Sequence, residues 1–225
     1  MKYNSLYIVS VLVVFNLLFV GCSGSSGGGG DDDTSSSTTT AILVVKATGQ
    51  TTSYDQNGNI VVNGTLKDDA YYQKGVIPRY TRASDIVTDE LTNLMWQDNA
   101  DVATVTKTWL TPANLDTCHN DTTSTACYDT SGYTAESYCN DLVLGGYTDW
   151  RLPTSNELES IIDYSKSGTT IDGTYFNNVN ASEYWSSTTY VRGKDSAWSI
   201  DFYNGTINDA YKDFNLHVRC VRDEI

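Results

Sequence analysis

The residues of this chain best suited to covalent chemistry are its five cysteines. Cys22 follows an apolar N-terminal run, which leaves four cysteines for the rest of the chain. An even number in an exported domain predicts disulfides, and four cysteines allow three pairings. We favour Cys139 with Cys220, because Cys139 lies on the apolar face of a predicted helix and Cys220 in the terminal strand. The same pairing joins Cys118 to Cys127 in a small local loop.

A predicted leader, residues 1–21, precedes Cys22. It has a positive charge near its start and an almost uninterrupted apolar run that is short for a membrane span. Residues 18–22, Leu-Phe-Val-Gly-Cys, are similar to the lipobox of bacterial lipoproteins, with Phe19 where Leu is usual. In that class an Asp after the cysteine retains the protein at the inner membrane, and here Ser23 follows. We therefore expect lipidation at Cys22 and delivery to the outer membrane; the alternative is an ordinary signal peptide and an unrelated cysteine.

Side chains for acid–base or metal chemistry are present but form no recognisable pattern. The two histidines, His119 and His217, have no partner nucleophile that the sequence marks. The cysteines lack the paired spacing of zinc ligands, and residues 55–59 fail the EF-hand template but fit a hairpin turn. The acidic run 31–33 belongs to a solvated segment. No catalytic residue, metal ligand or cofactor is therefore expected.

Recognition by loops is the chemistry that remains. Residues 190–194 and 203–215 are rich in Tyr and Asn, which supply rigid contact area beside adaptable hydrogen bonding. The predicted ligand-binding residues are Tyr190, Arg192, Lys194, Tyr203, Asn204, Asn208, Tyr211 and Lys212. The alternative is that these are solvated loops that bind nothing.

The tryptophans are expected to serve packing instead of recognition. Four of them fall in alternating strand patterns and are predicted to be buried: Trp96, Trp150, Trp185 and Trp198. Replacing one of the last three with Ala should cost roughly 3–5 kcal/mol of stability. Trp109 lies outside these patterns and is the freest candidate for ligand contact. Three arginines are expected to bond carboxylates or carbonyls at strand edges: Arg151, Arg219 and Arg222.

Two predicted helices and a short strand between them position these residues. The first helix is indicated by the helical spacing of Ala135, Tyr138, Cys139 and Leu142, and Gly145 stands where a left-handed cap belongs. The second begins with a capping box, Thr154 and Glu157, and has an apolar stripe of Leu158, Ile161 and Ile162. On the strand between them, Trp150 and Leu152 share one face and Arg151 takes the other.

The rest of the chain is predicted to form strands and loops. Strands are expected at residues 42–45, 60–62, 86–87, 94–96, 184–185, 197–202 and 218–221, with turns at Asn57-Gly58, Asn63-Gly64, residues 90–93 and Asn204-Gly205. Residues 111–131 and 165–181 are expected to be loops. The fold class is therefore α+β, with two helices packed on twisted antiparallel sheet and long loops.

Composition divides the chain into a leader, a tether and one domain. The tether, residues 22–40, is too rich in Gly, Ser, Thr and Asp to bury a core. The domain, residues 41–225, consists of an N-terminal extension (41–78) and a core (79–225). The formal net charge is −14, which opposes binding to nucleic acid and to anionic membrane surfaces.

A family resemblance rests on several ordered motifs. Gly-Tyr-Thr-Asp-Trp-Arg-Leu-Pro-Thr at residues 146–154, followed by Glu157-Leu158, resembles the Lcl C-terminal domain family. Further matching pieces lie at residues 87–89, 94–98, 184–188, 197–205 and 218–222. The resemblance implies a C-type-lectin-like or formylglycine-generating-enzyme-like fold and an association with cell-surface binding. The enzyme branch of that fold uses active-site cysteines, and calcium-dependent lectins use motifs that are absent from this sequence.

These observations predict a lipid-anchored protein of the bacterial cell envelope that binds a surface glycan or a protein through its C-terminal loops, without catalysis. Its contact with membrane is expected through the N-terminal lipid only, and no nucleic acid partner is expected. The alternatives are an envelope enzyme acting on glycans or peptidoglycan, and a purely structural envelope lipoprotein.

Overall fold

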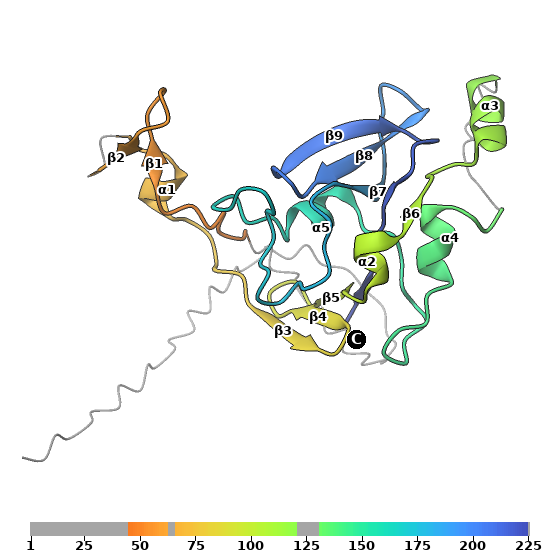
Figure 1. Ribbon diagram of the computed structural model, residues 1–225, viewed down its shortest axis with the longest axis horizontal. Helices are drawn as coiled ribbons and strands as arrows, with labels where there is room; N and C mark the ends of the chain where they lie inside the picture. Colours follow the sequence, from red (N-terminus) through yellow and green to blue (C-terminus); the bar gives the residue numbers. More distant parts are fainter. Residues whose placement is uncertain (1–44, 63–65, 121–130, 225) are drawn as a thin grey trace, which may run out of the picture. The chain divides into compact units, whose positions relative to one another are not determined.

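The computed structural model describes residues 45–62, 66–120 and 131–224, without the side chains of 118–120 (Figure 1). The chain divides into two units, residues 1–41 and 42–225, and all described residues belong to the second. Several predicted features lie outside the described residues: the leader, Cys22, the tether, the first residues of the 42–45 strand, the Asn63-Gly64 turn and Cys127. No helix among the described residues is long and apolar enough to cross a membrane.

Two sheets form the framework of the domain. The four-stranded sheet is antiparallel, in the order β11-β5-β4-β3, and its strands are β3 (Tyr80–Ala83), β4 (Ile86–Asp89), β5 (Leu94–Gln97) and β11 (Val221–Asp223). The five-stranded sheet has the order β6-β10-β7-β8-β9, and its strands are β6 (Thr106–Lys107), β7 (Glu183–Thr189), β8 (Ser196–Asp201), β9 (Thr206–Tyr211) and β10 (Leu216–His217). Only the β10–β7 pair is parallel among the described strands. The α+β class is confirmed.

Helices are more numerous and shorter than the sequence indicates. The described core contains α2 (Asp101–Thr104), α3 (Pro112–Asn120), α4 (Ala135–Asn140) and α5 (Ser155–Glu159). Helix α3 lies in the 111–131 segment, so the prediction of a loop there was wrong for its first half. Both predicted helices exist, as α4 and α5, but each ends before its apolar pattern does.

Local sequence signals explain how α4 and α5 begin. In α5 the Thr154 side chain accepts a bond from the Glu157 backbone and the Glu157 carboxylate accepts one from the Thr154 N–H, which confirms the predicted capping box. A second box, Thr134 with Ser137, starts α4. Gly145 has φ +64°, and a Cβ there would lie 2.4 Å from Ile86 Cδ1. The predicted left-handed glycine is therefore confirmed, although it lies beyond the end of α4.

Two apolar clusters lie on either side of this framework. The first joins both sheets to α5, through Val87 and Trp96 of one sheet, Tyr184 and Ile200 of the other, and Leu158. The second contains Trp150, Leu152 and Trp185 around a disulfide. Ile161 and Ile162, predicted for the second helix, are buried just after it ends.

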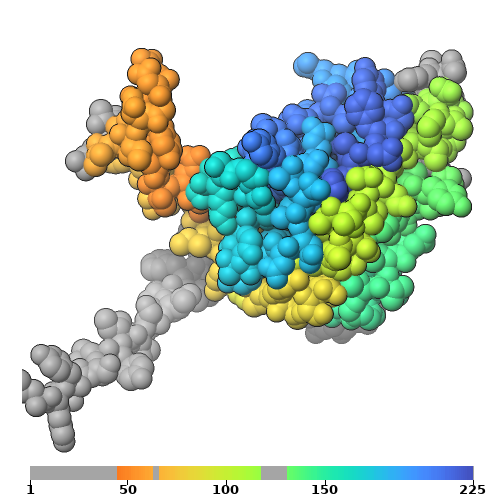
Figure 2. Space-filling model, in the orientation of Figure 1, coloured from red at the N-terminus to blue at the C-terminus, as the bar shows by residue number. Residues whose placement is uncertain are grey.

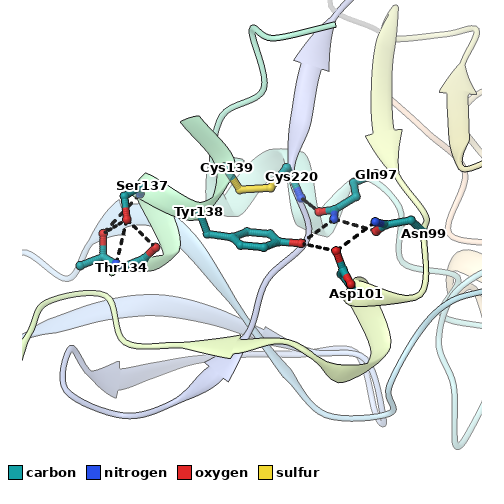
Figure 3. Close-up of a disulfide and its surroundings, with 8 residues drawn as sticks. All are labelled: Gln97, Asn99, Asp101, Thr134, Ser137, Tyr138, Cys139 and Cys220. Carbon is teal, nitrogen blue, oxygen red and sulfur yellow. Dashed lines mark hydrogen bonds between the residues drawn. A yellow bond between two sulfur atoms is a disulfide. The ribbon is translucent and has the colours of Figure 1, made fainter. Parts of the chain in front are cut away.

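The disulfide joins Cys139 of α4 to Cys220, which precedes β11, so this predicted pairing is confirmed. Figure 3 shows the polar bonds beside it: Gln97 accepts a bond from the Cys220 N–H and donates one to the Tyr138 hydroxyl. Burial is the main cause that raises the pKa of Tyr138 to about 12, so this hydroxyl is neutral at physiological pH. The bridge and these bonds hold α4 against β5 and the C-terminal segment.

The C-terminal segment serves both sheets. The predicted closing strand 218–221 was wrong in its bounds: β10 pairs with β6 and β7, the chain then leaves that sheet, and β11 pairs with β5. The expected strand around Trp150 is a single bridge between Arg151 and Val221, with the two faces as predicted. The segment 218–220, between β10 and β11, therefore links the two sheets.

The N-terminal extension forms a small separate set of elements. Its two-stranded sheet pairs β1 (Ser53–Tyr54) with β2 (Ile60–Val61), and α1 (Asp69–Tyr72) follows. The predicted hairpin turn is confirmed, because Asp55 accepts bonds from the Asn57 and Asn59 N–H groups and Gly58 has φ +80°. Lys46 pairs with the buried carboxylate of Asp89 and joins the extension to β4.

Candidate binding surface

The three arginines confirm their predicted structural roles. Arg219 is fully buried, where it donates to Asp98 Oδ1 at 3.0 Å and to the Gln97 and Asn178 carbonyls. Asp98 is buried too and also pairs with Arg82. Arg222 donates to Asp149 at 2.7 and 3.0 Å. Arg151 forms a two-pronged pair with Glu157 at 2.7 and 2.9 Å. These groups are occupied by the protein itself.

Lys212, a predicted ligand-binding residue, lies in the turn after β9, but its side chain points inward and is not exposed for ligand contact. Its side chain is buried, with Nζ 4.1 Å from the centre of the Trp109 ring and 3.3 Å from Thr189 Oγ1. Burial lowers the pKa of Lys212 to about 8, although the charge of Asp195 opposes this. Lys212 therefore braces the end of β9 from inside.

Trp109 is also structural, contrary to the prediction that it is free for a ligand. Its indole N–H donates to the Ser186 carbonyl at 2.9 Å, and one face of its ring is covered by Lys212. Its backbone N–H donates to the Lys212 carbonyl at 2.8 Å. Trp109 thus ties the segment before α3 to β7 and β9.

Trp198 is the one predicted core tryptophan that is not fully buried. Trp96, Trp150 and Trp185 are 0%, 2% and 0% exposed, as expected, whereas Trp198 is only partly buried. Its ring stacks edge-on against Tyr190, with the centroids 5.0 Å apart. Trp198 shares its sheet face with Ile200, as the alternation predicts, but only Ile200 belongs to the cluster that includes Leu158 of α5.

Trp198 and Tyr190 continue into a row of exposed aromatic side chains. In the β8–β9 pair, Trp198 is opposite Asp209 and Ser196 is opposite Tyr211, so Trp198 and Tyr211 share one sheet face as diagonal neighbours. Tyr211 stacks on Phe214 with centroids 5.8 Å apart, and the two are 53% and 52% exposed. We call Tyr190, Trp198, Tyr211 and Phe214 the aromatic row. Trp198 is in β8 and Tyr211 in β9, while Tyr190 and Phe214 follow β7 and β9; these C-terminal strands are coloured blue in Figure 2.

The predicted ligand-binding residues do not all meet at this row. Tyr190, Arg192, Lys194 and Tyr211 lie at the same end of the sheet, and Arg192 and Lys194 are exposed in the β7–β8 turn. Tyr203 and Asn204 lie in the β8–β9 turn at the opposite end of β9, which is about 20 Å away for a six-residue strand. Asn208 is in the strand, faces the other side and donates to Glu183 at 3.0 Å. The prediction of one loop over 203–215 was therefore wrong.

The chemistry of the aromatic row suits contact, not bond breaking. Exposed aromatic faces bind sugar rings, apolar side chains or cations, and Asp209 beside Trp198 supplies hydrogen-bond acceptors. The row also lies next to β9, a sheet edge whose outer backbone groups have no strand partner among the described residues. An extended partner could use that edge.

The nearest approach to an acid–base arrangement lies elsewhere, in a hollow of about 170 Å³ lined by Tyr80, Asp163 and Asp172 among others. Lys166 Nζ lies 3.5 Å from Asp163 and 3.4 Å from Asp172. Burial alone would raise the pKa of Asp172, but bonds from Thr174 and the charge of Lys166 outweigh it, so the pKa is lowered. A general acid needs the opposite shift.

Histidines and metal ligands offer no further site among the described residues. His217 packs against Tyr184 with ring centroids 5.2 Å apart, and burial lowers its pKa. The His119 side chain is outside the described set. No group of three or more His, Cys, Asp or Glu side chains in the described residues could hold a metal ion.

These observations define an α+β domain with a disulfide-braced core and an exposed aromatic row on its C-terminal strands. The chain belongs to the Lcl C-terminal domain family, whose model matches residues 85–222. The match begins just before β4 and ends in β11, so it covers the five-stranded sheet and most of the four-stranded sheet, without β3 and without the N-terminal extension. No curated protein matches the chain.

Proposed function

We propose that this protein is a lipid-anchored, non-catalytic binding protein of the bacterial cell surface. The aromatic row contacts a surface glycan or a protein, and Cys22 carries the lipid that holds the domain at the outer membrane. The observation that carries the proposal is the exposure of Tyr211 and Phe214 beside a partly buried Trp198 on one sheet face. Large exposed aromatic groups that cluster are typical of recognition surfaces.

The rigidity of the row supports this function. Trp198 is fixed by its strand and by Tyr190, and Lys212 holds the end of β9 from the opposite side. A preformed surface loses little conformational entropy when a ligand binds. Arg192 and Lys194 on one flank and Asp209 on the other give the ligand polar contacts of both signs.

The first experiment identifies a ligand and then measures its affinity for a variant that lacks two aromatic side chains of the row. The full chain is screened on glycan and protein arrays with and without a chelator. For any ligand found, Tyr211→Ser combined with Phe214→Ser should weaken binding at least tenfold, or about 1.4 kcal/mol, the range of an interface hot spot. The melting temperature should change little, because both rings are half-exposed.

Tyr203→Ser is the matched control, because Tyr203 is equally exposed (58%) but lies at the other end of β9. It should bind like the wild type. An equal loss of affinity in the control, or unchanged affinity in the Tyr211/Phe214 variant, would contradict the proposal that the ligand binds at the aromatic row. The anchor is tested separately with Cys22→Ala, whose unchanged membrane fractionation would contradict lipidation.

A further inference from the structure

The N-terminal extension has an apolar surface that its own fold leaves uncovered. Among the described residues from 45 to 78, only Ala70 is buried. Nine large apolar side chains there are between 38% and 77% exposed: Val45, Tyr54, Ile60, Val62, Leu66, Tyr71, Tyr72, Val76 and Ile77. Isolated exposed apolar residues need no explanation, but a group of this size marks an interaction surface.

Several of these side chains are adjacent. Tyr54 lies opposite Ile60 on one face of the β1–β2 pair, while Ser53 on the other face donates to Asp68 at the start of α1. An open hollow of about 360 Å³ is lined by Ile60, Val62 and Tyr71, among others. Tyr71 stacks against Tyr72 with centroids 5.1 Å apart. We call Tyr54, Ile60, Val62, Tyr71 and Tyr72 the extension face.

The extension face is held in place by polar bonds to the core. Lys46 pairs with buried Asp89 and donates to the Ser160 carbonyl at 3.0 Å. Thr48 accepts a backbone bond from Tyr164 at 2.9 Å, and its hydroxyl donates to Asp69. The extension face therefore stays exposed although the segment that carries it is bonded to the core.

Charge separates the extension from the remainder of the domain. Residues 45–78 contain three lysines and three aspartates and are formally neutral. Residues 79–225 contain ten Lys and Arg against 22 Asp and Glu, a net charge of −12. A surface with neutral headgroups would meet little electrostatic opposition at the extension, whereas a second copy of this acidic chain would be repelled. The extension is the part of the domain that lipid could approach.

We propose that the extension face docks on the zwitterionic surface of the bilayer that carries the anchor. This inference rests on the proposed lipid anchor at Cys22, from which Val45 is separated by 23 positions. A chain of that length spans at most about 80 Å, so anchoring keeps the face near the bilayer and raises its effective concentration there. Tyrosine suits this place, because its ring enters the interface while its hydroxyl stays hydrated.

The test uses the mature full chain, attached to phosphatidylcholine vesicles by a maleimide lipid at Cys22. The same chain with Cys22 capped by a small maleimide, mixed with the same vesicles, gives the reference. Amide hydrogen exchange of residues 53–62 and 69–77 should slow at least threefold on attachment. The variant Tyr54→Ser, Ile60→Thr, Val62→Thr, Tyr71→Ser should lose this slowing.

The matched control is Tyr133→Ser with Val143→Thr. These two side chains are 74% and 70% exposed and lie outside the extension, in residues 79–225. It should be protected like the wild type. Exchange that is unchanged on attachment, or equally slowed in the four-residue variant, would overturn the docking. Slowing that depends on protein concentration without vesicles would overturn it in favour of a second copy. Acylation in the cell is read separately from the mass of the N-terminal peptide, so a failed anchor and a failed docking give different results.

Discussion

Burial of Lys212 makes the stability of the domain depend on pH. Its pKa is about 8 in the fold, against 10.5 in the unfolded chain, chiefly because burial disfavours the charge. Below pH 8 both states hold the proton. Between about pH 8 and 10.5 the unfolded state holds it and the native state has lost it, so the contribution of Lys212 to stability rises with pH.

Comparison with Lys212→Met isolates this effect. The wild type should gain stability relative to the variant between pH 7.5 and pH 9.5, as measured by urea unfolding at each pH. The variant keeps the apolar stem against Trp109 but cannot titrate. Lys194→Met is the control, because Lys194 is exposed in the neighbouring turn and its difference from the wild type should stay level. A constant difference for Lys212→Met would show that this lysine does not titrate as proposed.

Residues also show where sequence reasoning fails. Lys212 and Trp109 were predicted to be on the surface from their types and neighbours. In the structure the Lys212 side chain packs over the Trp109 ring. Trp198 was placed in the core by its alternation with Ile200, but the sheet face is covered only at the Ile200 end, where Ile200 belongs to the cluster with Leu158. A two-residue period predicts which side chains share a face, and cannot tell how far along that face the covering element extends.

At the scale of elements, capping signals were the most dependable. The helix α5 is five residues long, too short to persist without tertiary packing, so its first turn depends on the Thr154–Glu157 box. Replacing Thr154 with Ala should cost about 1 kcal/mol of unfolding free energy, measured by urea denaturation. Thr154→Ser keeps the hydroxyl and should stay within a few tenths of the wild type. Equal losses in both variants would mean that the methyl group, not the cap, is responsible.

The elements that sequence reasoning missed share a physical reason. Helix α3 has no strong apolar stripe, and only Leu115 of its described side chains is buried, so periodicity gives little signal. The break between β10 and β11 is set by the two sheets that the chain must join, which is long-range information. By contrast, the β4–β5 hairpin and the β1–β2 turn were predicted because their turn residues act locally.

At the scale of the whole molecule, the Cys139–Cys220 bridge is the longest covalent constraint in the described chain. It closes a separation of 81 residues and joins α4 to the segment that links the two sheets. The unfolded chain loses most entropy when such a long loop is closed, which corresponds to about 4 kcal/mol of stability. The buried bonds of Gln97 to Cys220 and Tyr138 depend on the same alignment.

Replacing both cysteines with Ala should therefore lower the melting temperature by roughly 10 °C, given about 2–4 °C per kcal/mol for a domain of this size. The fold should persist, because the apolar cluster that contains both cysteines keeps Trp150 and Trp185, and the Arg219–Asp98 pair is unchanged. Calorimetry with and without reductant gives the measurement and its control. Reductant should lower the wild type more than the double variant, since only the wild type has this bridge to lose. A double variant that melts within about 2 °C of the wild type would show that packing alone aligns α4 with the C-terminal segment.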